Sequence, residues 1–279
     1  MREYRFVLAN VFAESHFGGN PLAIFPEAAG LSDTEMQHIA CQFNLSETVF
    51  AFPSVNAAAN LRIFTPATEL PFAGHPVLGC AFVLQQEKSL SENFTLNTRA
   101  KPVQLSSANN TITLQLKGYK AKQSKASHAA LAAASGISET QIAPTAYWLD
   151  SGSPQLLLQV NDHQALQKAK PDYSNLHSLC TNDGEKTVLY LWHEQGHTVH
   201  ARMFYTQNGT LLEDSGTGSA CANLGAYMIE QNRFPITLDI RQGEQTGRLN
   251  HLHLRVDEAK QIYVGGQVIE VGTGVFRLP

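Results

Sequence analysis

The sequence is poor in charged residues and in cysteine. Only 16% of its 279 residues are charged, the net charge is -4, and the lysines and arginines are scattered. Binding to nucleic acid or to anionic lipid needs clustered positive charge, so small molecules are the expected partners. The four cysteines are widely separated and form no C-x-x-C pair, which excludes a disulfide scaffold and a structural zinc site.

Long apolar runs are also missing. Residues 1–12 carry Arg2, Glu3 and Arg5 and lack the apolar core of a signal peptide, and no uncharged run approaches the length needed to cross a bilayer. We therefore expect a cytoplasmic protein with reduced thiols and without a membrane partner. Apolar residues nevertheless make up 43% of the chain, and its length suits two domains better than one.

One helix and one strand are predicted around residue 45. Ser32 and Glu35 form a capping-box pattern, which predicts a helix from there to about Asn44. From residue 45 the pattern changes to period two, which predicts a strand with Glu47 on an apolar face. The other members of that face are Leu45, Val49 and Ala51.

Two further helices are expected to be buried on all sides. Residues 74–76, Gly-His-Pro, open a helix that has no polar face before Gln85, and such a helix belongs in an interior. Residues 216–230 repeat this arrangement with small side chains, which allow strands to approach closely. Each helix follows a similar strand, Arg-Ile-Phe at 62–64 and Arg-Met-Phe at 202–204. The chain is therefore predicted to contain two similar halves.

The expected domain boundary lies in the Lys-, Ser- and Ala-rich stretch 119–144. We assign residues 1–118 to an N-terminal domain, completed by the last strand at about 267–279, and residues 119–266 to a C-terminal domain. The closing strands are predicted at 261–264 and 275–278.

The segment His193-Glu194-Gln195-Gly196-His197 matches the zinc motif H-E-x-x-H. That motif binds zinc only when both histidines share one face of a helix. Here the flanking residues are β-branched and aromatic, and Gly196 suits a turn, so the tip of a β-hairpin is predicted and no metal is expected.

The glycine turns before the two buried helices are candidates for binding an anion. A helix start presents unpaired amides and the positive end of the helix dipole. If the halves are related by a pseudo-twofold axis, the turns at Gly74 and Gly218 would face each other across an interdomain cleft and could hold a carboxylate. Taken singly, each turn is more typical of an ordinary helix start, and it is the repetition in both halves that favours the anion site.

Three residues could move protons. Glu47 would lose hydration on an apolar strand face, which suits a general acid or base, and the pattern fits a solvated strand-end glutamate equally well. Asp214 and His75 lie beside the two glycine turns. An aspartate before a helix is most often an N-cap, and a lone histidine there is commonly only packed.

Five motifs together resemble, in order and spacing, the phenazine-biosynthesis PhzF-like isomerase family over nearly the whole chain. They are Gly19-Asn20-Pro21-Leu22-Ala23, Leu45-Ser46-Glu47-Thr48, Arg62-Ile63-Phe64-Thr65-Pro66, Glu69-Leu70-Pro71-Phe72-Ala73-Gly74-His75-Pro76, and Glu213-Asp214 through Thr217-Gly218-Ser219-Ala220. The resemblance implies an α+β, diaminopimelate-epimerase-like fold. That fold has two pseudo-symmetric domains, each with a mostly antiparallel sheet curled around a central helix. It also implies a homodimer.

The resemblance further implies cofactor-independent proton transfer on a small carboxylate such as a cyclic hydroxylated diene acid. The family's glutamate falls on Glu47, and its supporting residues fall on His75, Asp214 and Ser219. The substrate-binding positions implied are Asn20, Gly74, Thr217, Gly218 and Ser219. One departure concerns Ser215-Gly216, where the family commonly has proline followed by a variable residue.

Two other functions are weighed against the isomerase. Two-base amino-acid epimerases of the same fold use a pair of thiols, whose positions are here taken by Ala73 and Ser215. Neither can serve as a thiol base, and Cys80 and Cys221 are expected inside helices, so a racemase is disfavoured. A protein that closes on a small anion without chemistry is the second alternative.

Overall fold

The computed structural model of the chain describes residues 1–182, 186–207 and 209–279. The chain divides into two compact units. The N-terminal unit consists of residues 1–115 and 265–279, and the C-terminal unit of residues 116–264. Among the helices of the described ranges, none has the length and apolar character required to span a membrane.

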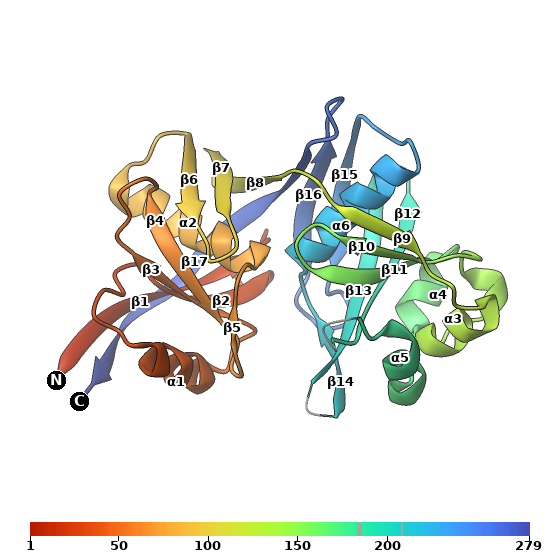
Figure 1. Cartoon of the computed structure of the whole chain (residues 1–279), viewed down its shortest axis with the longest axis horizontal. Coiled ribbons are helices and arrows are strands. Elements are labelled where there is room, and N and C mark those ends of the chain that lie inside the picture. The colour runs from red at the N-terminus through yellow and green to blue at the C-terminus, as the bar shows by residue number, and fades with distance from the viewer. Residues whose placement is uncertain (183–185, 208) are drawn as a thin grey trace. The chain divides into compact units, whose positions relative to one another are not determined.

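Strands of the N-terminal unit pair in a closed ring around one helix, α2 (Figure 1). The ring runs β17–β1–β2–β3–β4–β6–β7–β8 and returns to β17, and its pairs are mostly antiparallel, with β2–β3 and β4–β6 parallel. The elements are β1 Arg2–Val11, β2 Asn20–Phe25, α1 Asp33–Phe43, β3 Thr48–Phe52, β4 Ala59–Phe64, β5 Glu69–Leu70, α2 Gly74–Lys88, β6 Asn93–Asn97, β7 Pro102–Ala108, β8 Thr111–Leu116 and β17 Ile262–Leu278.

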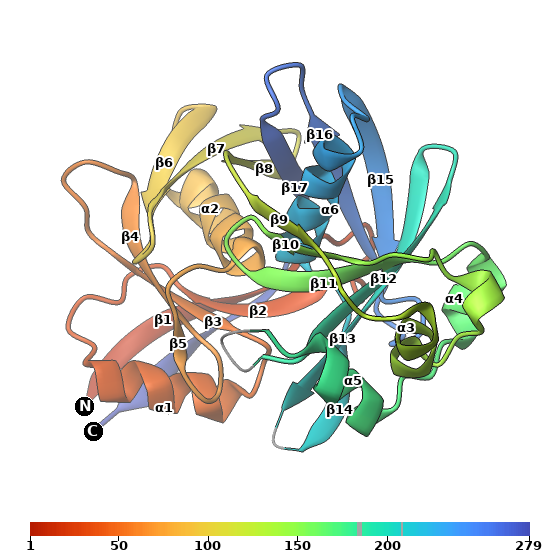
Figure 2. The same cartoon turned by 45° about the vertical axis from the view of Figure 1, so that its right-hand side comes forward.

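The C-terminal unit also has paired strands, in the order β9–β10–β11–β12–β13–β15–β16, and a central helix, α6, which contacts β9, β10, β11 and β16 (Figures 1 and 2). Its elements are β9 Lys120–Gln123, α3 His128–Ser135, the 3-10 turn Glu139–Gln141, β10 Tyr147–Asp150, β11 Pro154–Gln159, α4 His163–Lys168, α5 Tyr173–Cys180, β12 Val188–Gln195, β13 Thr198–Gln207, β14 Thr210–Asp214, α6 Gly218–Glu230, β15 Ile236–Gln242 and β16 Asn250–Val256. Strands β11–β12 and β13–β15 are parallel, as β2–β3 and β4–β6 are in the other unit.

The repeat extends to individual side chains. In the N-terminal unit Arg62 of β4 makes a bidentate ion pair with Glu69 of β5, with Nη2 2.8 Å from Oε2. In the C-terminal unit Arg202 of β13 makes the same pair with Glu213 of β14, at 2.7 Å. Bidentate pairing fixes the plane of the guanidinium relative to that of the carboxylate. Each hairpin is therefore held at the position from which the chain enters the buried helix.

The two central helices are buried as expected. In α2 the residues from Gly74 to Leu84 are buried except Phe82, and in α6 those from Gly218 to Ile229 are buried except Ser219 and Tyr227. A helix that is apolar on every side can be stable only when strands cover all of its faces, and the ring of strands provides this cover.

The first helix begins as the capping box predicts. The Ser32 hydroxyl accepts a hydrogen bond from the Glu35 amide at 3.3 Å, and the Glu35 carboxylate accepts one from the Ser32 amide at 2.8 Å. The helix ends at Phe43, and Asn44 adopts the left-handed conformation with φ 52°. Its apolar face packs in a core cluster that includes Met36 and Ile39.

Two expectations about strands are wrong. Strand β3 begins at Thr48, so residues 45–47 are not part of it and Glu47 is the residue immediately before the strand. The alternation misled because Val49, Phe50 and Ala51 are all buried, so β3 has no solvent face at these positions. The two closing strands predicted at 261–264 and 275–278 are parts of one continuous strand, β17. Residues 272–278 of β17 pair with β1, and the apolar pattern alone could not show this pairing.

Candidate active site

In the N-terminal unit, Glu47 and His75 form a hydrogen-bonded pair. His75 Nδ1 lies 3.0 Å from Glu47 Oε2. The His75 side chain is 5% exposed and that of Glu47 is 20% exposed. The pair joins the residue before β3 to the first turn of α2, and the two residues are 28 apart in sequence. An ionised carboxylate can only accept a hydrogen bond, so His75 Nδ1 is the donor whenever Glu47 is ionised.

The second nitrogen of this imidazole is also buried. His75 Nε2 has no hydrogen-bond partner among the described residues. Buried polar atoms are nearly always paired, and a catalytic role is one of the explanations for an unpaired one.

Gly74 and Asn20 are placed by local backbone requirements. Gly74 is the first residue of α2, whose N-cap, Ala73, supplies no side-chain hydrogen bond to the helix amides. Asn20 begins β2 and is 2% exposed. The preceding Gly19 has φ +75°, and a Cβ there would lie 2.7 Å from the carbonyl oxygen of Val11. Only glycine fits this turn, which brings the Asn20 side chain into the interior.

In the C-terminal unit, Asp214 organises the turn before α6. Its Oδ2 accepts a hydrogen bond from the Thr217 hydroxyl at 2.5 Å, and its Oδ1 accepts one from the Gly216 amide at 3.4 Å. Asp214 is therefore not the N-cap of α6. That position belongs to Thr217, which makes no side-chain bond to the helix amides. The first turn of α6 keeps its amides uncapped by side chains, as α2 does.

Gln242, at the end of β15, holds the same turn from the other side. Its Nε2 donates to the Asp214 carbonyl and to the Thr217 hydroxyl, each at 2.9 Å, and its Oε1 accepts from the Thr217 amide at 3.2 Å. The Gln242 side chain is fully buried. Sequence reasoning missed this residue, and its only signal was a polar side chain ending an alternating apolar strand.

Ser219, the second residue of α6, belongs to a separate polar network. Its hydroxyl accepts a hydrogen bond from Gln155 Nε2 at 2.9 Å. Gln155 Oε1 in turn accepts from Asn223 Nδ2 at 2.8 Å, and Asn223 Oδ1 accepts from the Ser151 amide at 2.8 Å. Ser219 thus takes the place in α6 that His75 has in α2, but it carries no carboxylate partner. Gln155 and Asn223 were also missed, because polar residues inside apolar segments cannot be paired from sequence.

The sequence-predicted residues thus fall into two groups. The structure brings Glu47 and His75 into contact in one unit, and Asp214 and Thr217 into contact in the other. Gly74 and Gly218 each begin a central helix.

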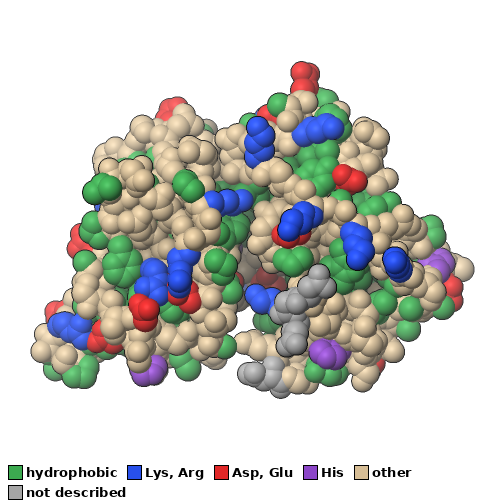
Figure 3. All heavy atoms as spheres, in the orientation of Figure 1, with side chains coloured by type: hydrophobic (Ala, Val, Ile, Leu, Met, Phe, Trp, Pro, Cys, Tyr) green, Lys and Arg blue, Asp and Glu red, His purple; other side chains and the backbone are tan. Residues whose placement is uncertain are grey.

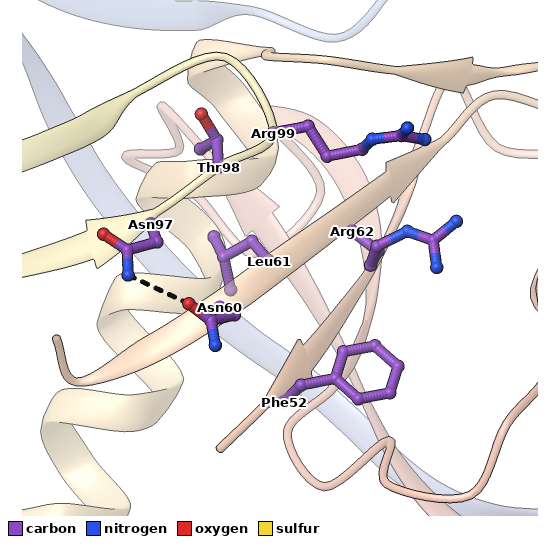
Figure 4. Close-up of a pocket in the computed structure, with 7 residues that line it drawn as sticks. All are labelled: Phe52, Asn60, Leu61, Arg62, Asn97, Thr98 and Arg99. Carbon is purple, nitrogen blue, oxygen red and sulfur yellow. Dashed lines mark hydrogen bonds between the residues drawn. The ribbon is translucent and has the colours of Figure 1, made fainter. Parts of the chain in front are cut away.

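A shallow pocket of about 230 Å³ in the N-terminal unit lies apart from these residues (Figure 4). Arg62 and Arg99 line it, but both contact Glu69, and Arg62 also contacts Asp33 at 2.8 Å. Ion pairing with these carboxylates compensates the two positive charges, so they are poorly suited to hold an anionic ligand. The pocket lacks any of the candidate proton carriers, and we assign no chemistry to it.

The cysteines and the zinc-like motif behave as structural elements. Cys80 and Cys221 are fully buried in α2 and α6, and burial raises the pKa of the Cys80 thiol to about 12 and that of Cys221 still further. Such thiols stay protonated at neutral pH and are poor bases. The predicted hairpin is confirmed, because His193 lies on β12, Gly196 has φ +64° and His197 lies in the turn. His193 Nδ1 lies 2.9 Å from the Val160 carbonyl, and Glu194 pairs with Arg233.

Charges of both signs are interspersed on the face of the molecule drawn in Figure 3.

Comparison with known proteins places this arrangement in a family. Residues 9–274 match the phenazine biosynthesis-like protein family, PhzC-PhzF, and the chain belongs to that family. An uncharacterized isomerase of Pasteurella multocida is 43% identical over 99% of this chain and 95% of its own length. The trans-2,3-dihydro-3-hydroxyanthranilate isomerase of Pseudomonas aeruginosa is 30% identical over 92% of this chain and 91% of its own. Both of these relatives are named as isomerases, and the chain is an isomerase of the PhzF family.

The fold comparison agrees. The crystal structure of the Bacillus anthracis phenazine biosynthesis protein of the PhzF family superposes with a TM-score of 0.86, covers 100% of both chains and is 22% identical. At that identity it shows the fold alone. Together with the ring of mostly antiparallel strands around a central helix, it confirms the expected α+β fold class.

Proposed function

We propose that this isomerase moves a proton on a small carboxylate, with Glu47 as the general acid and base and without a cofactor. The observation that carries the proposal is the contact between His75 Nδ1 and Glu47 Oε2 at 3.0 Å, in a largely buried setting. A carboxylate that must first accept and then return a proton needs a fixed orientation and little bulk water. The hydrogen bond and the burial supply these two conditions.

The proposed step is an isomerisation on one face of the substrate. Glu47 removes a proton from a carbon made acidic by a neighbouring unsaturated or carboxylate-bearing system. The electron pair shifts through that system, and the same carboxyl group returns the proton at another carbon, so the atoms balance without a redox partner. In this scheme His75 is a positioning residue, because it acts through Glu47.

We propose that the C-terminal unit contributes to substrate binding through the turn Asp214–Ser219. Thr217, Gly218 and Ser219 offer the amides and hydroxyl groups of a helix start, which favour an anionic group. Asp214 shapes this turn by accepting from Thr217 and Gly216. Asn20 and Gly74 are assigned the corresponding binding role in the N-terminal unit.

The name of one relative supports a substrate class. The Pseudomonas aeruginosa relative is named for trans-2,3-dihydro-3-hydroxyanthranilate, a cyclic unsaturated carboxylate. We propose a compound of this class as the substrate, and trans-2,3-dihydro-3-hydroxyanthranilate is the first compound to test.

The proposal is tested by replacing Glu47 with Gln. The amide keeps the shape of the side chain but cannot accept the proton, so turnover should fall by roughly two to four orders of magnitude while substrate binding is largely retained. The matched control is Glu27→Gln, the same change at an exposed glutamate of the same unit, which should leave turnover unchanged. Wild-type turnover by Glu47→Gln would refute the role of Glu47.

A second measurement separates isomerisation from simple binding. In deuterium oxide the wild-type protein should place solvent deuterium at the carbon that receives the proton, because the Glu47 carboxyl exchanges with solvent between turnovers. Nuclear magnetic resonance of the product would locate it. Binding of the carboxylate without any deuterium incorporation, across a panel of unsaturated acids, would support the non-catalytic alternative.

A further inference from the structure

The C-terminal unit contains a cluster of potential metal ligands that shares no residue with the sites described above. His163, His200 and Glu244 each offer one ligand atom, and these atoms lie within 4.8 Å of one another. His200 Nδ1 is 3.2 Å from Glu244 Oε1, and His163 Nε2 is 3.9 Å from Glu244 Oε2. Bonds of 2.0–2.1 Å at tetrahedral angles separate neighbouring ligand atoms by about 3.4 Å. The cluster is therefore within small side-chain adjustments of a coordination shell.

Three separate segments hold these side chains. His163 is the first residue of α4, where the preceding Asp162 accepts hydrogen bonds from two helix amides and so fixes the backbone. His200 is in the interior of β13, paired with β12 on one side and β15 on the other. Glu244 follows β15 in the connection to β16. The rigidity of two of the three segments limits the reorganisation that binding would cost.

The imidazole of His163 provides an independent indication. Its Nε2, the atom that faces Glu244, is buried and has no hydrogen-bond partner within the described residues. The ring also lies against that of His200, with centroids 4.0 Å apart. Two imidazoles in van der Waals contact, with one ring nitrogen unpaired beside a carboxylate, are better explained by a shared cation than by packing alone.

We propose that His163, His200 and Glu244 bind a divalent transition metal ion of the Zn²⁺ or Co²⁺ type. Two imidazoles and one carboxylate suit these ions, whereas Ca²⁺ and Mg²⁺ prefer a shell of oxygen atoms. Three protein ligands leave the remaining positions to water.

This site differs from the H-E-x-x-H segment. His193 stacks near His163, with ring centroids 6.0 Å apart, but its Nδ1 is directed to the Val160 carbonyl. His197 lies exposed in the hairpin turn. The proposed ligand set therefore shares no residue with that motif.

The location suggests what the ion does. Glu244 is two residues beyond Gln242, which holds Asp214 and Thr217 through three hydrogen bonds. A metal bound to Glu244 would tie the connection after β15 to α4 and β13. It would thereby stabilise the segment that orders the Asp214 turn, so the ion is proposed as a structural and regulatory group and not as a participant in proton transfer.

The test uses the full chain, purified without a histidine tag, treated with a chelator and titrated with Co²⁺ while its visible absorption is recorded. Wild-type protein should bind one Co²⁺ per chain, and Zn²⁺ should displace it. His200→Ala and Glu244→Gln should each weaken binding by at least roughly tenfold. Glu244→Gln keeps the size of a side chain that is 30% exposed, so this variant is expected to fold. It therefore tests the proposal even if His200→Ala fails to fold.

Two matched variants sharpen the result. His197→Ala should bind as the wild type does, because the H-E-x-x-H segment takes no part. Arg241→Gln should bind more tightly, because Arg241 pairs with His200 across β13 and β15 and its positive charge opposes a cation. The absence of saturable Co²⁺ binding by the wild type overturns the proposal, as does a loss in His197→Ala equal to that in His200→Ala. None of these readouts depends on isomerase activity.

Discussion

The hydrogen bond between His75 and Glu47 can be tested by two replacements that differ in a single property. His75→Leu fills a similar volume but removes the donor and leaves Glu47 Oε2 without this partner. His75→Asn places an amide nitrogen close to the position of Nδ1 and can keep the bond. The His75 side chain is only 5% exposed. A water molecule therefore cannot take the place of the lost hydrogen-bond donor without disturbing the surrounding packing.

The size of the effect follows from the charge of the acceptor. A hydrogen bond to a charged group contributes about 1.5–3 kcal/mol, which corresponds to roughly a 10- to 150-fold change in rate if the bond is needed in the transition state. His75→Leu should therefore lower kcat by that factor with little change in KM, and His75→Asn should restore most of it.

The assay is turnover of trans-2,3-dihydro-3-hydroxyanthranilate, or of whichever unsaturated carboxylate the wild-type protein converts. Circular dichroism and thermal unfolding of each variant control for folding. Combining His75→Leu with Glu47→Gln gives a double-mutant cycle, and the double variant should be little worse than Glu47→Gln alone, because His75 acts through Glu47. If His75→Asn loses as much activity as His75→Leu, or if the two effects multiply, the positioning role is refuted.

Two further predictions concern stability. Gly79→Ala in α2 would place a Cβ 2.5 Å from Leu22 Cδ2, whereas a Cβ at Gly272 meets nothing within 4 Å. In Gly79→Ala, overpacking should outweigh the better helix propensity of alanine and lower the free energy of unfolding, measured in urea, by about 1–2 kcal/mol. The control Gly272→Ala should change this free energy little. Equal effects of the two substitutions would contradict the packing argument. The second prediction concerns Glu35, whose pKa is lowered from 4.5 to about 2 by its hydrogen bond to Arg2 and then by Ser32. Its ionised form therefore adds stability above pH 4.5 that is lost as the pH falls toward 2. The gap in melting temperature between wild type and Glu35→Gln should close over that range, and a gap independent of pH would count against it.

Features with a short-range physical cause could be predicted from the sequence. The capping box of Ser32 and Glu35 depends on residues three apart, and the hairpin at Gly196 depends on a turn residue between two β-branched runs. The burial of α2 was predictable because its apolar residues surround the helix axis, and only a covering of strands can accommodate them.

The same logic failed where burial removed the periodic signal. Strand β3 is covered on both sides, so its alternation gave no information about where it begins, and Glu47 was placed on a strand that starts one residue later. The family resemblance implied that His75 supports Glu47, but no local pattern predicted the hydrogen bond between them. Its geometry depends on how β3 and α2 pack, which no local pattern encodes.

Sequence alone thus determined the family motifs, the two buried helices and the residue types available for proton transfer. Tertiary structure decided how distant segments meet. It closed the strand ring by pairing Arg2 with Leu278, it placed Gln242 against Asp214, and it gathered His163, His200 and Glu244 into one cluster. The physical reason is that helix caps and turns are stabilised by neighbours in the chain, whereas strand pairing and polar clusters are stabilised by residues that only folding brings together.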